Sequence, residues 1–459
     1  MKNNVRRLAY VILAGLVAIC VYLALIPYYL KHTPGGGALT DPRIAARENM
    51  IQRGTIFDRE GRVLARSVPQ TDGGFVREYS LGSYASHIIG YYSIKAGSAG
   101  LEKTRASVLL GLNEGNPFYS LMNRVTGKPG VGNDMILTID ADLQQYVATL
   151  LDGQKGAAVV LNPATGEILA SASYPRFDPA KVTDYLNQPD SPLLDRALQG
   201  AYPPGSIFKI VTAAGILTDL PGMTDETIQC NGELEVNGFI LKDNAVHGNV
   251  DFKEAFTRSC NVAFGRYGLA LGAKDFVKQA GAFGIGVSPD FPLPLYQGYL
   301  PRVDELDGPA LASSAIGQGK VLVSPLQAAL VAGAVANGGE IMKPYLISRY
   351  SGPGGFEKTF KPEKWLVPMT PAVAGVLKDE MIAVVQSGTG KAAALPGITV
   401  AGKTGSAENP HGQSHAWFVG FAPAEQPRVV VAVVLENQGS GGAKAAPLAG
   451  EILRRALEG

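Results

Sequence analysis

The stretch GAAVVLNPATGEILASAS, residues 156–173, predicts a β-hairpin at the start of the main folded region. Two apolar runs flank Asn162-Pro163-Ala164-Thr165-Gly166, whose residue types are typical of turns. Further strands and a last amphipathic helix are predicted near the C-terminus, in 397–405, 416–423, 428–436 and 446–458. Because the residues between these strand regions show helical spacing, the predicted fold class is α+β, with an antiparallel sheet flanked by helices.

Composition favours a folded chain of two or three domains, since 46% of its 459 residues are hydrophobic and 18% are charged. Lys and Arg (41) nearly balance Asp and Glu (40), so no nucleic-acid partner is predicted. Three cysteines, Cys20, Cys230 and Cys260, are too few for a disulfide scaffold. Two free thiols are favoured at Cys230 and Cys260, and a disulfide between them stays the alternative.

Residues 8–30 contain no charged residue and are long enough to span a bilayer as a helix. Lys2, Arg6 and Arg7 precede this run. The positive-inside rule therefore predicts a cytoplasmic tail at 1–7, a single transmembrane anchor at 8–30 and the rest of the chain outside the cell membrane. The alternative is a cleaved signal peptide, which usually has a shorter apolar core.

A linker and a small mixed domain, which we call the pedestal, are predicted between the anchor and the hairpin, in residues 31–150. The linker is rich in Pro and Gly at 31–42, and RGTIFDREGRVLARS (53–67) alternates like a hairpin with its turn at 58–61. The main domain is predicted to occupy residues 151–459. A structural network of charged pedestal side chains is predicted for Arg53, Asp58 and Glu102.

A serine and a lysine lie three residues apart in AYPPGSIFKIV, residues 201–211. Ser206 precedes an apolar helical run, and Lys209 would share its helix face. Burial disfavours the ammonium form of lysine, and a neutral amine is the kind of base that a serine nucleophile needs. The alternative is structural: Ser206 caps the helix and Lys209 extends to the surface.

Two further motifs follow along the chain. Ser259-Cys260-Asn261 places a hydroxyl and a carboxamide two residues apart, and Gly402-Lys403-Thr404-Gly405-Ser406 ends a predicted strand. Singly, a capping serine and an edge-strand lysine explain them. Together, S-x-x-K, S-x-N and K-T-G in this order are the signature of the penicillin-recognising serine enzymes.

The resemblance to class B penicillin-binding proteins extends over nearly all of residues 53–459. RGTIFDREGRVLA and GSAGLEK (97–103) resemble the pedestal motifs of that family. LTIDADLQ, YPPGSIFK, IGQGKVLVSPLQ, GTGKAAALPGITVAGKTGSAE and WFVGFAP resemble its transpeptidase domain. Cys260 inside S-x-N and Ser406 after K-T-G depart mildly from the commonest pattern, and neither removes a hydrogen-bonding group that the chemistry needs.

The resemblance implies a peptidoglycan D,D-transpeptidase that uses no metal or cofactor and that β-lactams inhibit covalently. Ser206 would attack the penultimate D-alanyl carbonyl of a stem peptide, and Lys209 would take its proton. Ser259 and Lys403 would relay a proton to the departing D-alanine, and the charge of Lys403 would help to keep Lys209 neutral.

The substrate-binding roles are implied in the same way. The oxyanion hole would consist of the backbone N–H groups of Ser206 and Ser406. Asn261 would hold the peptide amide, while Thr404, Gly405 and Ser406 would form the turn that receives the terminal carboxylate. A class B enzyme cross-links glycan strands that it does not polymerise, so the resemblance also implies a SEDS-type membrane glycosyltransferase as partner.

Alternative functions share part of these motifs. A serine β-lactamase or a D,D-carboxypeptidase has the same triplet, and a non-catalytic β-lactam sensor or division scaffold would retain Ser206 without turnover. A class A enzyme needs a glycosyltransferase domain, for which residues 31–150 are too few. SGTGK (387–391) lacks the remaining residues of a phosphate loop, and Pro410 and Gly412 disfavour a helical zinc pair of His411 and His415.

Overall fold

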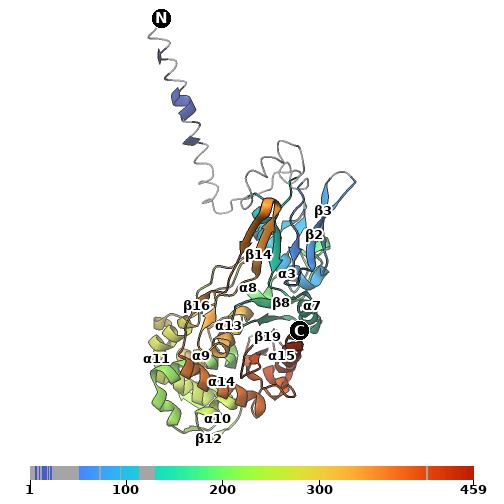
Figure 1. Cartoon of the computed structure of the whole chain (residues 1–459). Coiled ribbons are helices and arrows are strands. Elements are labelled where there is room, and N and C mark those ends of the chain that lie inside the picture. Colours follow the sequence, from blue (N-terminus) through green and yellow to red (C-terminus); the bar gives the residue numbers. More distant parts are fainter. Residues whose placement is uncertain are drawn as a thin grey trace. The chain divides into compact units, whose positions relative to one another are not determined.

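The computed structural model describes residues 6–7, 10, 13–17, 19, 21–22, 51–71, 74–93, 95–112, 130–409 and 412–458. The chain divides into two units, Met1–Met50 and Ile51–Gly459 (Figure 1). Much of the anchor predicted at 8–30 and all of the linker predicted at 31–42 lie outside the described residues, as does His411. Within the described parts, no helix has the length and apolar character that a membrane crossing needs.

An antiparallel five-stranded sheet forms the centre of the second unit, in the order β17-β18-β19-β7-β8. The hairpin and the C-terminal strands that the sequence predicts are its members: β7 (Gly156–Leu161), β8 (Ile168–Tyr174), β17 (Ala401–Ala407), β18 (His415–Ala422) and β19 (Val429–Leu435). Every residue of β7 and β19 is buried, because helices cover both faces of the sheet. The α+β prediction is confirmed.

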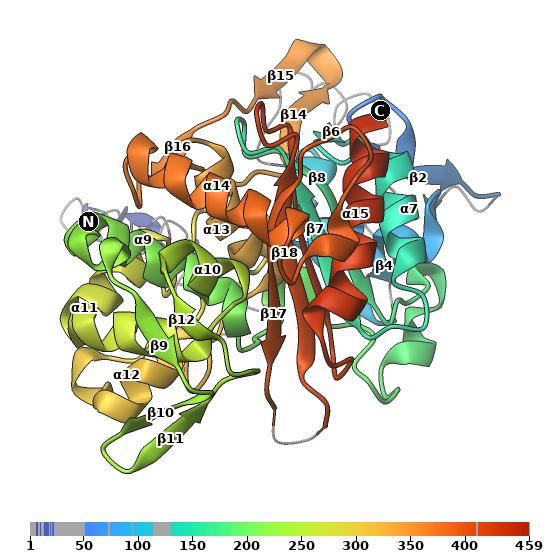
Figure 2. The same ribbon diagram turned by 90° about the horizontal axis from the view of Figure 1, so that it is seen from below.

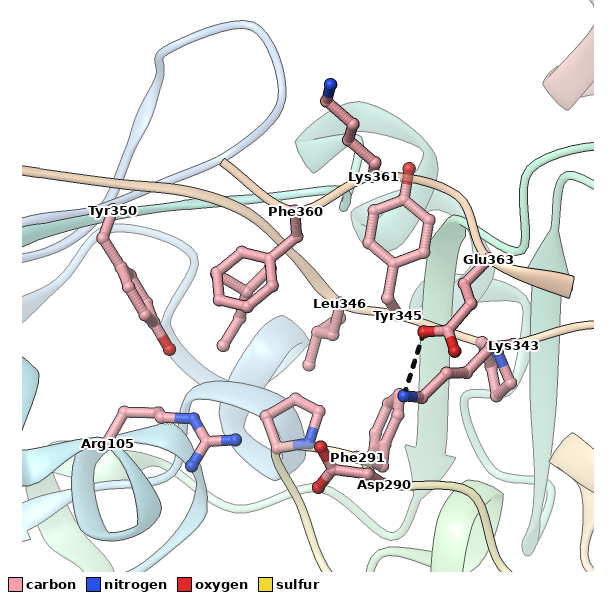
Figure 3. A pocket seen from close by; sticks show the side chains of 13 residues that line it. Arg105, Asp290, Phe291, Lys343, Tyr345, Leu346, Tyr350, Phe360, Lys361 and Glu363 are labelled. Carbon is pink, nitrogen blue, oxygen red and sulfur yellow. Dashed lines mark hydrogen bonds and ion pairs between the residues drawn. The ribbon is translucent and has the colours of Figure 1, made fainter. Parts of the chain in front are cut away.

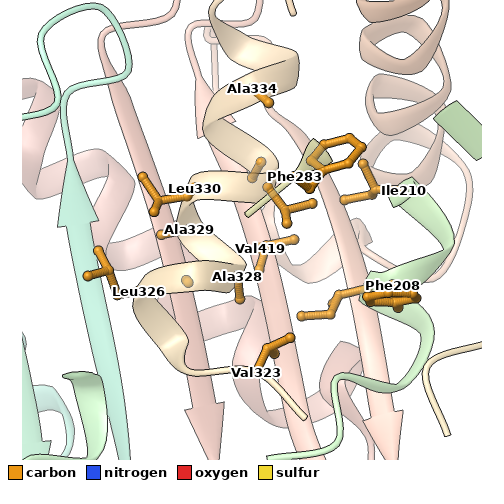
Figure 4. Close-up of a cluster of buried hydrophobic side chains, with 14 of the residues drawn as sticks. Phe208, Ile210, Phe283, Val323, Leu326, Ala328, Ala329, Leu330, Ala334 and Val419 are labelled. Atoms are coloured by element: carbon orange, nitrogen blue, oxygen red, sulfur yellow. The ribbon is translucent and has the colours of Figure 1, made fainter. Parts of the chain in front are cut away.

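Each face of the sheet carries its own hydrophobic cluster, and Figure 2 shows helices beside the sheet. The helices α7 (Ala141–Leu150) and α15 (Gly441–Glu458) pack on one face, and α13 (Pro325–Ala336) packs on the other. Figure 4 shows Ala328 and Ala329 of α13 beside Val419 of β18, where their small side chains let the helix approach the sheet closely. Phe208 and Ile210 lie in the same cluster, so the segment after Ser206 is anchored in the core.

Helices and short hairpins fill the long segment between the two parts of the sheet. The helices that bear on the site are the 3₁₀ helix η3 (Gly205–Phe208), α9 (Lys209–Asp219), α10 (Phe252–Thr257), α11 (Asn261–Ala282), α12 (Gly308–Ala315) and α14 (Pro371–Gln386). Two antiparallel strand pairs lie beside them: β9 (Ile228–Cys230) with β12 (Gly248–Val250), and β10 (Glu233–Val236) with β11 (Phe239–Lys242).

The pedestal contains a six-stranded sheet in the order β15-β14-β6-β1-β2-β3. Four strands come from the N-terminal side, β1 (Ile56–Phe57), β2 (Val63–Pro69), β3 (Phe75–Tyr79) and β6 (Asp134–Leu137). The turn between β1 and β2 is held by Asp58, whose Oδ1 accepts the N–H groups of Glu60 and Arg62 at 2.9 and 2.7 Å. The other two strands, β14 (Ile347–Gly352) and β15 (Phe356–Thr359), come from within the range predicted for the main domain.

A buried ion network ties the pedestal together. The Glu102 side chain is fully buried and receives Arg53 Nε at 3.1 Å and Arg77 Nε at 2.6 Å. The Arg53 guanidinium also lies over the ring of Tyr92. Each of these cations therefore contacts a carboxylate directly, which offsets the cost of removing both charges from water.

A pocket opens where the pedestal strands leave the main domain (Figure 3). Its walls are aromatic and charged, and Lys343 pairs with Glu363 at 3.2 Å across one side. None of the residues named in the three sequence motifs lines this pocket.

Candidate active site

Ser206 is placed by a close approach between η3 and the edge strand β17. Gly205 has a φ of +55°, and a Cβ at this position would come within 2.9 Å of the Ser406 carbonyl oxygen. The preceding turn is fixed by Trp417, whose Nε1 donates to the Pro203 carbonyl at 3.0 Å. Only glycine meets both demands at 205, namely the positive φ and the missing side chain.

The helix at Ser206 begins as a 3₁₀ turn and becomes α-helical at Lys209, whereas the sequence predicts a single helix. A 3₁₀ turn contains three residues, so the side chains at 206 and 209 lie directly above one another. Ser206 and Lys209 therefore share a helix face as predicted, although the turn between them is tighter than in an α-helix.

Lys209 is fully buried and its ammonium group has three acceptors. Nζ donates to the Ser259 carbonyl at 2.5 Å, to Asn261 Oδ1 at 2.8 Å and to Ser259 Oγ at 3.2 Å. These bonds use all the donors of an ammonium group. An ammonium group has no acceptor site, so Lys209 must be neutral when it takes a proton from Ser206.

Lys403 reaches the same serine from the opposite side. Its Nζ donates to Ser259 Oγ at 2.8 Å and to the Thr404 carbonyl at 3.2 Å, and the side chain is fully buried. Ser259 itself has a φ of +62°, a left-handed conformation that is uncommon for a residue with a side chain. The S-x-N segment is thus bent so that the Ser259 hydroxyl lies between two lysines.

The two lysines share one buried environment, and burial lowers the pKa of both. The pKa of Lys209 falls to about 8, although the nearby Asp243 carboxylate opposes the shift. Burial first, and then the positive charge of Lys209, lower the pKa of Lys403 well below its usual value. Two like charges in one buried environment disfavour each other, which agrees with the prediction that the charge of Lys403 favours a neutral Lys209.

The remaining motif residues line a cleft of about 280 Å³ above the lysines. Ser206, Ser259 and Asn261 lie on its helical side, and Asn261 Nδ2 donates to the Lys242 carbonyl at 3.0 Å. The strand side consists of Thr404, Gly405 and Ser406. All eight residues that the sequence singles out therefore come together, six of them in the wall of the cleft and two beneath it.

Several cleft residues were not predicted from the sequence. Thr389 Oγ1 lies 2.5 Å from Thr404 Oγ1, and Gln318 Nε2 donates to the Ser406 carbonyl at 3.3 Å. Thr389 belongs to SGTGK, which has no phosphate-loop pattern but precedes the K-T-G strand. Asp243 also lines the cleft and lies between β11 and β12, where no sequence motif marks it.

Comparisons with known proteins agree on the family. The family described as Penicillin binding protein transpeptidase domain matches residues 156–454, and the family described as Penicillin binding protein A dimerisation domain matches residues 53–135. The peptidoglycan D,D-transpeptidase PbpA of Mycolicibacterium smegmatis is 34% identical, over 100% of this chain and 99% of its own length. Its namesake in Mycobacterium tuberculosis is 32% identical, with 100% of both chains covered.

Solved structures are similar over most of this chain. A D,D-transpeptidase domain from Eggerthella lenta has a TM-score of 0.82 and 37% identity, with 89% of this chain and 99% of that chain covered. The imipenem acyl-enzyme complex of penicillin-binding protein A from M. tuberculosis has a TM-score of 0.83 and 32% identity, with 89% and 100% covered. The full-length matches and the domain matches lead to one conclusion: the chain belongs to the penicillin-binding protein family and carries its transpeptidase domain.

Proposed function

We propose that this protein is a peptidoglycan D,D-transpeptidase that cross-links stem peptides during cell-wall synthesis through an acyl-enzyme on Ser206. The observation that carries the proposal is the convergence of two buried lysines on Ser259 Oγ beneath a cleft that contains Ser206. Neither lysine forms an ion pair with a carboxylate among the described residues, and burial disfavours the charged form of both. β-Lactams, which mimic the D-Ala-D-Ala terminus, would acylate the same serine.

Acylation begins when neutral Lys209 takes the proton of the Ser206 hydroxyl. Ser206 Oγ then forms a bond to the penultimate D-alanyl carbonyl carbon, and the backbone N–H groups of Ser206 and Ser406 stabilise the oxyanion. The C–N bond to the last D-alanine breaks. The leaving nitrogen receives its proton through Ser259 Oγ, which lies within hydrogen-bond distance of both Lys209 and Lys403.

The stem peptide would bind as an extended strand along β17. β17 is an edge strand of the five-stranded sheet, and its free edge faces the cleft, so its backbone groups are available to a peptide. Asn261 would hold the amide of the donor peptide from the other side. Thr404 and Ser406, with Gly405 between them, would receive the terminal carboxylate.

An amine of a neighbouring stem peptide would then attack the acyl-enzyme, form the cross-link and release Ser206. A serine β-lactamase needs instead a group that activates water for rapid deacylation. Glu408 is an acidic residue in the cleft wall beside Ser406, and the resemblance assigns it no such role. A D,D-carboxypeptidase remains the second candidate function, because the same acyl-enzyme would then pass to water.

The cellular setting is part of the proposal. Residues 1–7 would be cytoplasmic, 8–30 a transmembrane anchor, 31–150 the linker and pedestal, and 151–459 the transpeptidase domain outside the membrane. The uncharged run at 8–30 with basic residues before it supports this orientation. A SEDS-type glycosyltransferase would supply the nascent strand, and the small residues Ala14, Gly15 and Ala18 would let one of its helices approach the anchor.

Mass spectrometry after incubation with penicillin tests the catalytic assignment. We expect one adduct on Ser206 that persists for many minutes, and none in Ser206→Ala. An adduct on another residue would refute the assignment, and release within seconds would indicate a β-lactamase.

Co-purification tests the partner. The chain with residues 1–30 replaced by an unrelated anchor should lose the co-expressed glycosyltransferase but keep its reaction with penicillin. Equal recovery of the glycosyltransferase with either anchor, and also after substitution of exposed pedestal residues, would contradict the assigned contact.

A further inference from the structure

Four metal-binding side chains converge directly behind the S-x-N segment. Cys230, Asp243, His247 and Cys260 each offer one ligand atom, and these atoms all lie within 4.8 Å of one another. They belong to the end of β9, the loop after β11, the residue before β12 and the N-cap of α11. β9 and β12 lie beside α10 and α11 at one end of the domain (Figure 2). The proposed transpeptidase chemistry uses none of these four groups.

The separations between the ligand atoms are close to those of a tetrahedral zinc site. Asp243 Oδ2 lies 3.0 Å from Cys260 Sγ, 3.3 Å from Cys230 Sγ and 3.6 Å from His247 Nδ1. Cys230 Sγ lies 3.6 Å from His247 Nδ1. Neighbouring ligands on one zinc ion are about 3.3–3.8 Å apart, given Zn–S near 2.3 Å and Zn–N or Zn–O near 2.0–2.1 Å. These four separations therefore lie near those of a bound zinc ion, and all six are below 4.8 Å.

The four side chains are also held in place before any ion arrives. Both cysteines and the Asp243 side chain are fully buried, and the His247 side chain is 8% exposed. The pairing of β9 with β12 sets Cys230 opposite Gly248, next to His247. Asp243 Oδ2 also accepts the Val262 N–H at 2.9 Å, at the start of α11. Such fixed geometry is what a structural metal site requires.

The donor atoms select the class of metal. Two sulfurs, one imidazole nitrogen and one carboxylate oxygen form a set that zinc accepts, whereas Ca²⁺ and Mg²⁺ prefer oxygen ligands alone. The four donors complete a tetrahedron and leave no open position for a substrate, as in structural sites. Binding would release the thiol protons to solvent, so that two thiolates and one carboxylate surround the ion.

We propose that Cys230, Asp243, His247 and Cys260 bind one Zn²⁺ ion, which fixes the conformation of the S-x-N segment. Cys260 lies between Ser259 and Asn261, the residues that contact Lys209. Ser259 has the left-handed φ of +62°, a conformation that persists only where the surroundings hold it. A metal bond to Cys260 would supply that restraint, so the four ligands are positioning residues for the cleft. A Cys230–Cys260 disulfide would use up both thiolates, so the two states exclude each other.

Metal analysis of the full chain tests the site without any turnover. The protein is purified in detergent with reductant and without chelator, and its zinc content is measured by mass spectrometry. We expect about one zinc per chain, as a closed four-ligand site binds. Cys230→Ser and His247→Ala should lose it, and the matched control Cys20→Ser should keep it. Wild-type protein without zinc, a Cys230–Cys260 disulfide in its place, or unchanged zinc in both variants would overturn the site.

Chelation of the wild-type protein tests the positioning role and needs no variant to fold. Removal of zinc should slow the reaction of Ser206 with fluorescent penicillin at least several-fold, and added Zn²⁺ should restore the rate. An unchanged rate in zinc-free protein would refute the positioning role. A chain that binds zinc but never reacts with penicillin would instead contradict the proposed function, so the two failures are distinguishable.

Discussion

Two clusters of buried cations lie in this molecule, and they are built in opposite ways. In the pedestal, Arg53 and Arg77 both contact the Glu102 carboxylate. Beneath the cleft, the hydrogen bonds of Lys209 and Lys403 go to a hydroxyl, an amide oxygen and backbone carbonyls. The arginine pairs are permanently charged and compensated, whereas the lysines can lose their protons because no carboxylate among the described residues pairs with them. Contact with a carboxylate therefore distinguishes the structural cluster from the reactive one.

Lys209→Met, in the lysine cluster beneath the cleft, should have the largest effect. Without the base, the rate at which penicillin acylates Ser206 should fall about 10²- to 10⁴-fold. The free energy of unfolding should change little, because the substitution also removes a buried charge that has no carboxylate partner. Acylation with fluorescent penicillin and thermal unfolding measure the two effects. Lys278→Met, at an exposed lysine of α11, is the control, and a wild-type acylation rate in Lys209→Met would contradict the assigned role.

Glu102→Gln tests the structural role of the arginine cluster in the pedestal. Two buried guanidinium groups would lose their carboxylate, and we expect a destabilisation of about 3–5 kcal/mol. The folded fraction should still react with penicillin at the wild-type rate, since Glu102 lies in the pedestal and does not line the cleft. Denaturant unfolding and acylation rates at low temperature check both statements. A loss of acylation without a loss of stability would show that Glu102 contributes to the reaction and not to the stability of the pedestal.

The pH dependence also distinguishes the lysines, which can titrate, from the arginines, which stay charged. Because burial lowers the pKa of Lys209 to about 8, the rate of Ser206 acylation should rise as the pH increases from about 7 to 9. Between the folded pKa and the usual lysine value of 10.5, the unfolded chain binds more protons than the folded one, so the stability rises with pH in that window. Unfolding and acylation profiles of wild type and Lys209→Met should differ there. Identical profiles would exclude Lys209 as the titrating group.

Glu78→Gln should have the smallest effect. Arg66 and Glu78 pair at 2.8 Å on the pedestal surface, where both side chains are about half exposed. An exposed pair of this kind contributes about 0–1 kcal/mol, so the variant should unfold close to wild type. It is the matched partner of Glu102→Gln in the same domain. An equal loss of stability in the two variants would show that burial is not what distinguishes these ion pairs.

The sequence predicts the reactive cluster better than its surroundings. Ser206, Lys209, Ser259 and Lys403 lie in short motifs whose chemistry limits the choice of residue, and the strands at 397–436 follow from apolar runs buried on both faces. Thr389 was missed as a cleft residue, because its contact with Thr404 depends on how α14 ends against β17. Such contacts depend on packing between distant elements, which local patterns do not encode.

The same limit applies to the zinc ligands and to the pedestal sheet. The sequence offers Cys230 and Cys260 as a pair, but Asp243 and His247 join them only because β9 and β12 are paired. Likewise, β14 and β15 lie in a range that the sequence predicts to belong to the main domain and to be mostly helical. They join the pedestal sheet because Ile347–Ser351 pair in antiparallel register with Asp134–Leu137, which are distant in the sequence.

That register has a consequence for biosynthesis. The segment Asp134–Leu137 is complete on the ribosome long before Ile347–Gly352, its neighbour in the finished sheet. The two segments are separated by 210 residues, from 137 to 347, and translation at about 5–20 residues per second needs roughly 10–40 s to cross that interval. Throughout this time one side of the nascent sheet has unsatisfied backbone groups that other chains could capture. A holding chaperone would therefore help this protein most in that interval, and slower translation between residues 137 and 347 should increase its aggregation.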